Sequence, residues 1–77
     1  MILSVVGLGK LGSPMAACFA AKGHRVVGVD LVERHVRMIN EGKAPVFEPG
    51  LQEMLDKSGG RLTATGDLYE AARTANI

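Results

Sequence analysis

The stretch Gly7-Leu8-Gly9-Lys10-Leu11-Gly12 decides the fold, because it places a G-x-G-x-x-G pattern between two kinds of periodicity. The residues before it, 2–6, form a short apolar run typical of a parallel strand buried on both faces. After it, apolar residues recur at helical spacing from Lys10 to Lys22, and a second apolar run covers residues 25–30. Strand, helix and strand within about 30 residues predict a βαβ unit.

Each glycine of the pattern has a physical role in such a unit. Gly7 permits the tight turn out of the strand, Gly9 lets the backbone approach a pyrophosphate, and Gly12 lets the helix lie close to the strand. The free amides and the dipole at the helix start favour phosphate, and Lys10 adds positive charge nearby. The context predicts a dinucleotide site at residues 7–12 in an α/β fold, a Rossmann-type doubly wound parallel sheet. The alternative is an ordinary strand-to-helix turn.

Asp30 ends the second predicted strand, where a ribose-binding acid is expected. Its carboxylate can accept from both hydroxyls of an adenosine ribose and repels a 2′-phosphate, so the sequence favours NAD over NADP. Arg34 and His35 are near enough to tolerate the extra phosphate. The alternative role of Asp30 is that of a turn or helix-capping carboxylate.

The rest of the chain predicts further α/β structure. The expected elements are a helix over 33–41, a proline-containing loop over 43–49, a helix over 50–57, a strand over 62–65, a helix capped by Asp67 with Glu70 as its capping-box partner, and the start of a further strand at Asn76-Ile77. In the first helix four side chains are expected to form a buried apolar stripe: Leu11, Met15, Cys18 and Phe19.

Composition excludes several classes of function. A net charge of +1 gives no reason to expect nucleic acid or an acidic membrane surface as partner, and the apolar N-terminus is too short to span a membrane. The single cysteine, Cys18, fits a reducing compartment, and we expect a cytoplasmic protein. Its place on the apolar stripe favours packing over catalysis, and His35 has no second ligand at metal-binding spacing. At 77 residues the chain is expected to be the N-terminal part of a dinucleotide-binding domain, with the remaining strands and a substrate domain lying elsewhere.

A second segment carries a resemblance to a known family. Asn40-x-Gly42-Lys43-Ala44-Pro45-Val46-Phe47-Glu48-Pro49-Gly50-Leu51 is similar to the N-x-G-x-x-P-x-x-E-P-G-L segment of the UDP-glucose/GDP-mannose dehydrogenase family. The run Gly60-Arg61-Leu62-Thr63-Ala64-Thr65-x-Asp67 also resembles that family's next strand and helix start. The chain departs from the pattern at Lys10-Leu11, where Tyr-Val is common, and at His35, where another basic residue often stands.

The resemblance implies an NAD-dependent enzyme that oxidises the C6 alcohol of a UDP- or GDP-sugar to a carboxylate by two hydride transfers. It implies that Gly7, Leu8, Gly9, Lys10, Leu11, Gly12, Asp30, Arg34 and His35 contact NAD. It also implies a homodimer for the full-length protein and a catalytic cysteine that maps onto none of these residues, so the segment alone is expected to be inactive.

Two alternatives remain open. The stretch Gly12-Ser13-Pro14-Met15-Ala16 is similar to 3-hydroxyisobutyrate and 6-phosphogluconate dehydrogenases, which implies a single oxidation of a 3-hydroxyacid. A non-catalytic, NAD-binding regulatory domain is the other, because a fold alone does not establish a function.

Overall fold

The computed structural model describes residues 1–75 and contains three strands and four helices within them. In chain order they are β1 (Ile2–Val6), α1 (Gly12–Ala21), β2 (Arg25–Val29), α2 (Glu33–Asn40), α3 (Leu51–Ser58), β3 (Leu62–Thr65) and α4 (Leu68–Thr74). These elements agree with the sequence-based expectations to within two residues at each end. The further strand predicted at Asn76-Ile77 lies outside the described residues.

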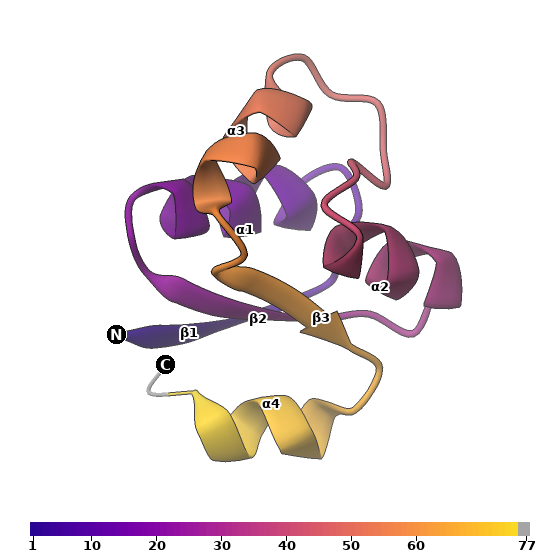
Figure 1. Ribbon diagram of the computed structural model, residues 1–77. Coiled ribbons are helices and arrows are strands. Elements are labelled where there is room, and N and C mark those ends of the chain that lie inside the picture. Colours follow the sequence, from indigo (N-terminus) through magenta and orange to yellow (C-terminus); the bar gives the residue numbers. More distant parts are fainter. Residues whose placement is uncertain (76–77) are drawn as a thin grey trace.

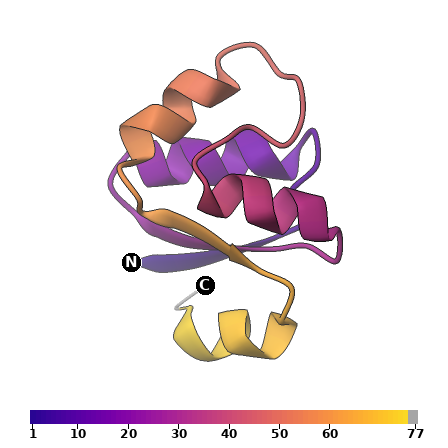
Figure 2. The same cartoon turned by 45° about the vertical axis from the view of Figure 1, so that its right-hand side comes forward.

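The three strands form one parallel sheet in the order β1-β2-β3. The central strand β2 pairs on both sides, so that Gly28 lies between Val5 of β1 and Ala64 of β3. Helices α1, α2 and α3 lie on one face of the sheet and α4 lies on the other (Figures 1 and 2). Because the strands are parallel and helices lie on both faces, the predicted Rossmann-type α/β fold is confirmed.

Small side chains hold α1 against the rest of the core. Its buried residues are Ser13, Ala16, Ala17 and Ala20. The three alanines pack in one cluster with Leu8, Val26, Ile39, Leu51, Leu55 and Leu62. The predicted apolar stripe of α1 is therefore wrong: Leu11 is 84% exposed and Met15 is 51% exposed, while Cys18 and Phe19 are half-buried. The reason is close approach, since α3 lies directly over α1 (Figure 1) and only small side chains fit on that face.

Strand β1 is less buried than the sequence suggested. Residues Ile2–Val5 are half-buried and Val6 is 69% exposed, whereas a strand covered on both faces was expected. Within the described residues β1 pairs with β2 alone, so its outer edge carries no strand.

Side-chain hydrogen bonds fix the start of α4 and the position of β3 against α1. Asp67 caps α4 as predicted, because its Oδ1 accepts from the amides of Tyr69 and Glu70. In a capping box the Glu70 side chain would accept from the amide of Asp67. Here the hydroxyl of Thr65 lies between the two residues, because it accepts from the amide of Asp67 and donates to Glu70. Arg61 donates from Nε to the carbonyl of Ala20, which fixes the start of β3 against the end of α1.

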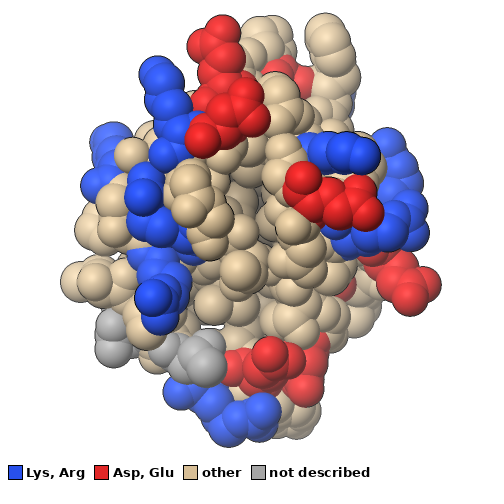
Figure 3. All heavy atoms as spheres, in the orientation of Figure 1, with Lys and Arg blue, Asp and Glu red and all other residues tan. Residues whose placement is uncertain are grey.

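The surface carries charges of both signs. On the face in Figure 3, charged side chains of both signs surround an uncharged centre, with Lys and Arg gathered on the left, and the net charge is +1. Among residues 1–75 no helix is both long enough and apolar enough to cross a membrane.

Candidate functional site

The glycine-rich loop leaves β1 through a tight, strictly glycine-dependent turn. Gly7 has φ +93°, and its amide donates to the carbonyl of Val29 at the end of β2 over 2.7 Å. A β-carbon on Gly12 would stand 1.6 Å from the carbonyl oxygen of Gly7. The backbone therefore requires glycine at residue 12, as expected for close packing of helix on strand.

Gly9 differs from these two glycines. Its φ lies outside the left-handed region, and a β-carbon built on it meets no atom within 4 Å. Neither the backbone conformation nor internal packing requires glycine here. The open space above Gly9 is what close approach of an external group needs.

Leu8 is anchored on both sides of its backbone. Its amide donates to Oδ2 of Asp30 over 2.7 Å, and its carbonyl accepts a hydrogen bond from the hydroxyl of Ser13. The side chain is fully buried and lies against Gly28, where a β-carbon would come within 2.6 Å of it. Leu8 thus positions the loop, and its amide is already used by the carboxylate.

The start of α1 is open to an anion. The N-cap residue, Leu11, provides no side-chain acceptor, and the first turn contains no acidic residue. In this turn the Ser13 amide donates to the Gly9 carbonyl over 3.0 Å, and Pro14 has no N–H. Among the described residues this leaves the Gly12 amide without a backbone partner at the positive end of the helix dipole. Lys10 is exposed nearby.

Asp30 stands just after β2 with its carboxylate largely enclosed by donors. Oδ1 accepts from the amide of Val32 over 2.8 Å, and Oδ2 accepts from the Leu8 amide and from Nδ1 of His35 over 3.1 Å. Burial on its own raises the pKa of Asp30, but these hydrogen bonds and the nearby imidazole outweigh it and lower the pKa below its usual 3.8. The carboxylate is therefore ionised at neutral pH.

The two basic residues that follow Asp30 take different positions. His35, in the first turn of α2, contacts the Asp30 carboxylate directly. Arg34 donates from Nη1 to the carbonyl of Pro45 over 3.0 Å and so binds the proline-containing loop. Of the pair, only His35 is brought to Asp30 by the structure.

Two hollows meet at the turn out of β1. One, of about 360 Å³, contains Asp30 and is lined by Val6, Gly7, Val29, Asp30, Leu31, Gly66 and Leu68. The other, of about 460 Å³, follows the loop and is lined by Val5, Val6, Gly7, Gly9, Lys10, Leu11, Gly12 and Met15. Because Val6 and Gly7 belong to both, an extended ligand can pass from the carboxylate to the start of α1.

Sequence reasoning did not find Leu31 and Leu68, which line the hollow around Asp30. Leu31 is 93% exposed and Leu68 is 53% exposed, so both present apolar surface to an incoming ligand. A large apolar residue directly after the acid is a weak signal for this role. Leu68 has no signal of its own, because only the crossing from β3 to α4 brings it there.

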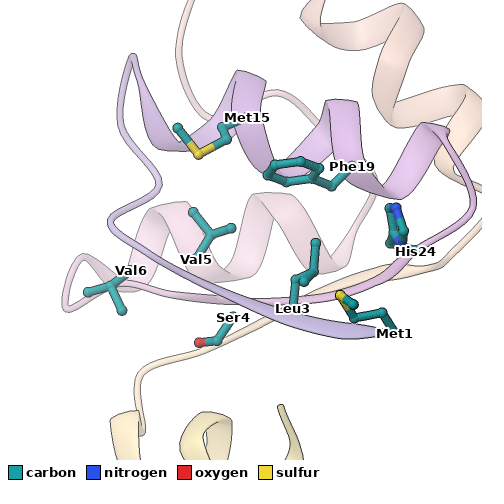
Figure 4. A pocket seen from close by; sticks show the side chains of 8 residues that line it. All are labelled: Met1, Leu3, Ser4, Val5, Val6, Met15, Phe19 and His24. Carbon is teal, nitrogen blue, oxygen red and sulfur yellow. The ribbon is translucent and has the colours of Figure 1, made fainter. Parts of the chain in front are cut away.

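A larger hollow, of about 540 Å³, runs along β1 beneath α1 (Figure 4). Leu3 and Val5 point from the strand toward Met15 and Phe19 of the helix, while Ser4 points to the opposite face. The lining is mostly apolar and has no carboxylate or amine side chain. We define these four facing residues, Leu3, Val5, Met15 and Phe19, as the edge groove.

Comparison with known proteins gives one consistent result. A family model described as "UDP-glucose/GDP-mannose dehydrogenase family, NAD binding domain" matches residues 1–77. The GDP-mannose 6-dehydrogenase of Pseudomonas syringae pv. syringae is 46% identical over 79 aligned positions, which cover 100% of this chain and 18% of that protein. The UDP-glucose 6-dehydrogenase of Haloferax volcanii is 48% identical, over 96% of this chain and 17% of its own length.

Solved structures agree with the sequence matches. The crystal structure of a ternary complex of GDP-mannose dehydrogenase from Pseudomonas aeruginosa superposes with a TM-score of 0.92 at 40% identity, over 97% of this chain and 18% of that one. A UDP-glucose dehydrogenase from Pyrobaculum islandicum gives a TM-score of 0.87 at 39% identity, over 96% and 18%. The chain thus spans less than a fifth of the length of these relatives.

Proposed function

The chain belongs to the UDP-glucose/GDP-mannose dehydrogenase family, whose NAD binding domain it matches over residues 1–77, and we propose that residues 7–12 and Asp30 hold NAD. The observation that carries this proposal is the meeting of two hollows at Gly7, one containing the Asp30 carboxylate and the other the open space above Gly9. One hollow offers an acceptor for ribose hydroxyls, and the other is lined by Gly12, whose amide is free for phosphate within the described residues.

Different residues contact different parts of the cofactor. Asp30 accepts from the adenosine ribose, with Leu31 and Leu68 providing apolar surface on the same side. The Gly12 amide at the start of α1 donates to the diphosphate above Gly9, and Lys10 adds positive charge there. Leu8 and Ser13 keep the loop in place through their hydrogen bonds, and Leu8, which was predicted to contact NAD, lines neither hollow.

We propose that the whole protein oxidises the C6 alcohol of a UDP- or GDP-sugar to a carboxylate, as the names of its relatives suggest. Bound NAD supplies the hydride acceptor. The change removes two hydrides from one carbon, with water providing the second carboxylate oxygen, so two NAD are reduced per sugar. Cys18 lies in α1 and lines neither of the two hollows, so we assign it no part in this chemistry.

Assembly and location are also proposals. A homodimer and a cytoplasmic location are suggested by the family resemblance, and the free thiol of Cys18 is compatible with a reducing compartment. We further propose that residues 1–77 form the N-terminal part of a larger domain, whose continuation covers the edge groove and pairs with the outer edge of β1. The support is the length of the relatives and the apolar lining of that groove.

The test is the amount of NADH formed per molecule of sugar by the protein in its full natural length, with a panel of UDP- and GDP-sugars. Two NADH per sugar are expected, and the panel identifies the substrate. One NADH per molecule, or activity on small 3-hydroxyacids alone, would replace this function with a single oxidation. NAD binding without turnover on any alcohol would indicate a regulatory domain.

A further inference from the structure

The contact between His35 and Asp30 joins an imidazole ring to the candidate ribose-binding acid. Nδ1 of His35 lies 3.1 Å from Oδ2 of Asp30, and the two side chains are 18% and 12% exposed. An ionised carboxylate only accepts hydrogen bonds, so Nδ1 carries the proton in this contact. The other ring nitrogen, Nε2, is then an acceptor in the neutral ring and a donor in the imidazolium.

The donors around Asp30 leave little of its capacity for a ligand. A carboxylate has about four acceptor positions, two on each oxygen. Oδ2 already accepts from Leu8 and His35, and Oδ1 accepts from Val32. About one position on Oδ1 remains, so a ribose with two hydroxyls needs a second acceptor beside the carboxylate, or must displace His35.

We propose that His35 determines cofactor specificity and makes the choice between NAD and NADP depend on pH. The neutral ring offers Nε2 as an acceptor for a ribose hydroxyl and leaves the charge of Asp30 to repel a 2′-phosphate. The imidazolium offsets that charge and offers Nε2–H to the phosphate. The inference rests on the proposed binding of NAD at Asp30 and deepens it.

The other charged groups around α2 do not bond the ring in the described part of the chain. They are Glu33, Arg34 and Arg37 on the helix itself, Glu41 at its end, and Lys43 and Glu48 on the loop that Arg34 binds. Arg34 is held by the Pro45 carbonyl, and Lys43 lies 3.6 Å from a Glu41 oxygen. Strand β3, which packs against α2, has no titratable side chain. Asp30 is thus the charged group that responds directly to His35.

The experiment measures dissociation constants for NAD and NADP between about pH 5.5 and 8.5, the range in which histidine changes charge. It uses the protein in its full natural length, as wild type, His35→Asn and His35→Lys. Asparagine keeps an N–H donor near the position of Nδ1 but is never charged, and lysine stays charged throughout. The 2′-phosphate itself titrates near pH 6, and the asparagine variant records that contribution.

The preference for NAD is the dissociation constant of NADP divided by that of NAD. In the wild type this ratio is expected to equal that of His35→Asn at the alkaline end of the range and to approach that of His35→Lys at the acid end. From the alkaline to the acid end, the preference of the wild type for NAD should fall about tenfold more than that of His35→Asn. A wild-type profile parallel to that of His35→Asn overturns the inference and leaves NAD binding intact. If one variant fails to fold, the other still gives the preference expected for a permanently neutral or a permanently charged residue 35, against which the wild type is compared. Failure of the wild type to bind NAD at any pH overturns the proposed function, and the inference with it.

Discussion

The amide of Leu8 donates to Oδ2 of Asp30 over 2.7 Å, and this bond joins the glycine-rich loop directly to the end of the second strand. Asp30 therefore has two roles, since it orients the loop backbone and presents its remaining acceptor position to a ligand. A substitution at Asp30 changes the loop as well as the proposed ribose contact. Substitutions in the loop itself separate the two effects better.

Gly9→Ala should lower NAD affinity, whereas Gly12→Ala should lower the stability of the fold. Alanine at residue 9 meets no atom of the protein, so the unfolding free energy should stay within about 0.5 kcal/mol while NAD affinity falls about tenfold or more. Alanine at residue 12 collides with the Gly7 carbonyl and should destabilise the fold by several kcal/mol.

Thermal melts and NAD titrations of the two variants check this pair. A Gly9→Ala protein that binds NAD like the wild type would mean that no ligand approaches there. A stable Gly12→Ala protein would contradict the close contact between loop and helix.

Asp30 should make the stability of the protein depend on acid pH. Because its folded-state pKa lies below 3.8, the carboxylate stabilises the fold above about pH 4, and this contribution is lost as the pH falls through the lowered value. Asp30→Asn should cost about 1–3 kcal/mol at pH 7 and progressively less below pH 4. Unfolding free energies at several pH values measure the gap, with exposed Glu53→Gln as the control. A gap that does not close in acid would contradict the assignment.

Gln52 should matter for stability and not for the cofactor. Its Oε1 accepts from the Ala44 amide and its Nε2 donates to the Gly42 carbonyl. These two hydrogen bonds hold the start of the proline-containing loop against α3. Gln52→Ala should lower the unfolding free energy by about 1–2 kcal/mol and leave NAD affinity unchanged. A large loss of NAD affinity in this variant would place the loop in the cofactor site.

Residues 1–77 expressed alone should be marginally stable and prone to self-association. The edge groove exposes apolar surface, and β1 offers an unpaired outer edge in the described structure. Sedimentation and a thermal melt of the isolated segment test this expectation. A soluble monomer with a sharp, cooperative melt would refute it.

The sequence predicted the elements of this fold well because each one carries local signals. The glycine pattern and the Asp67 cap are determined by the needs of the backbone within a few residues. The buried face of α1 was mispredicted because its small residues are selected by α3, which lies far along the chain. Helical spacing finds the largest apolar side chains, and here two of them, Leu11 and Met15, are exposed.

The same limit applies to the candidate site. Gly7, Gly9, Gly12 and Asp30 follow from a pattern, whereas the contact of His35 with Asp30 depends on how the first turn of α2 is placed. Leu68 reaches the hollow only through the β3–α4 connection. Arg34 looked equivalent to His35 in the sequence, but its guanidinium binds the Pro45 carbonyl.

The most direct test of the central claim is a titration of NAD and NADP into the full-length wild-type protein and Asp30→Ala, with Glu53→Ala as an acid removed from the site. The wild type should prefer NAD. Asp30→Ala should lose about 10- to 100-fold in NAD affinity and show a narrower gap to NADP, because it loses the acceptor for ribose hydroxyls and the charge that repels a 2′-phosphate. Equal NAD affinity in the wild type and Asp30→Ala would show that Asp30 does not hold the ribose.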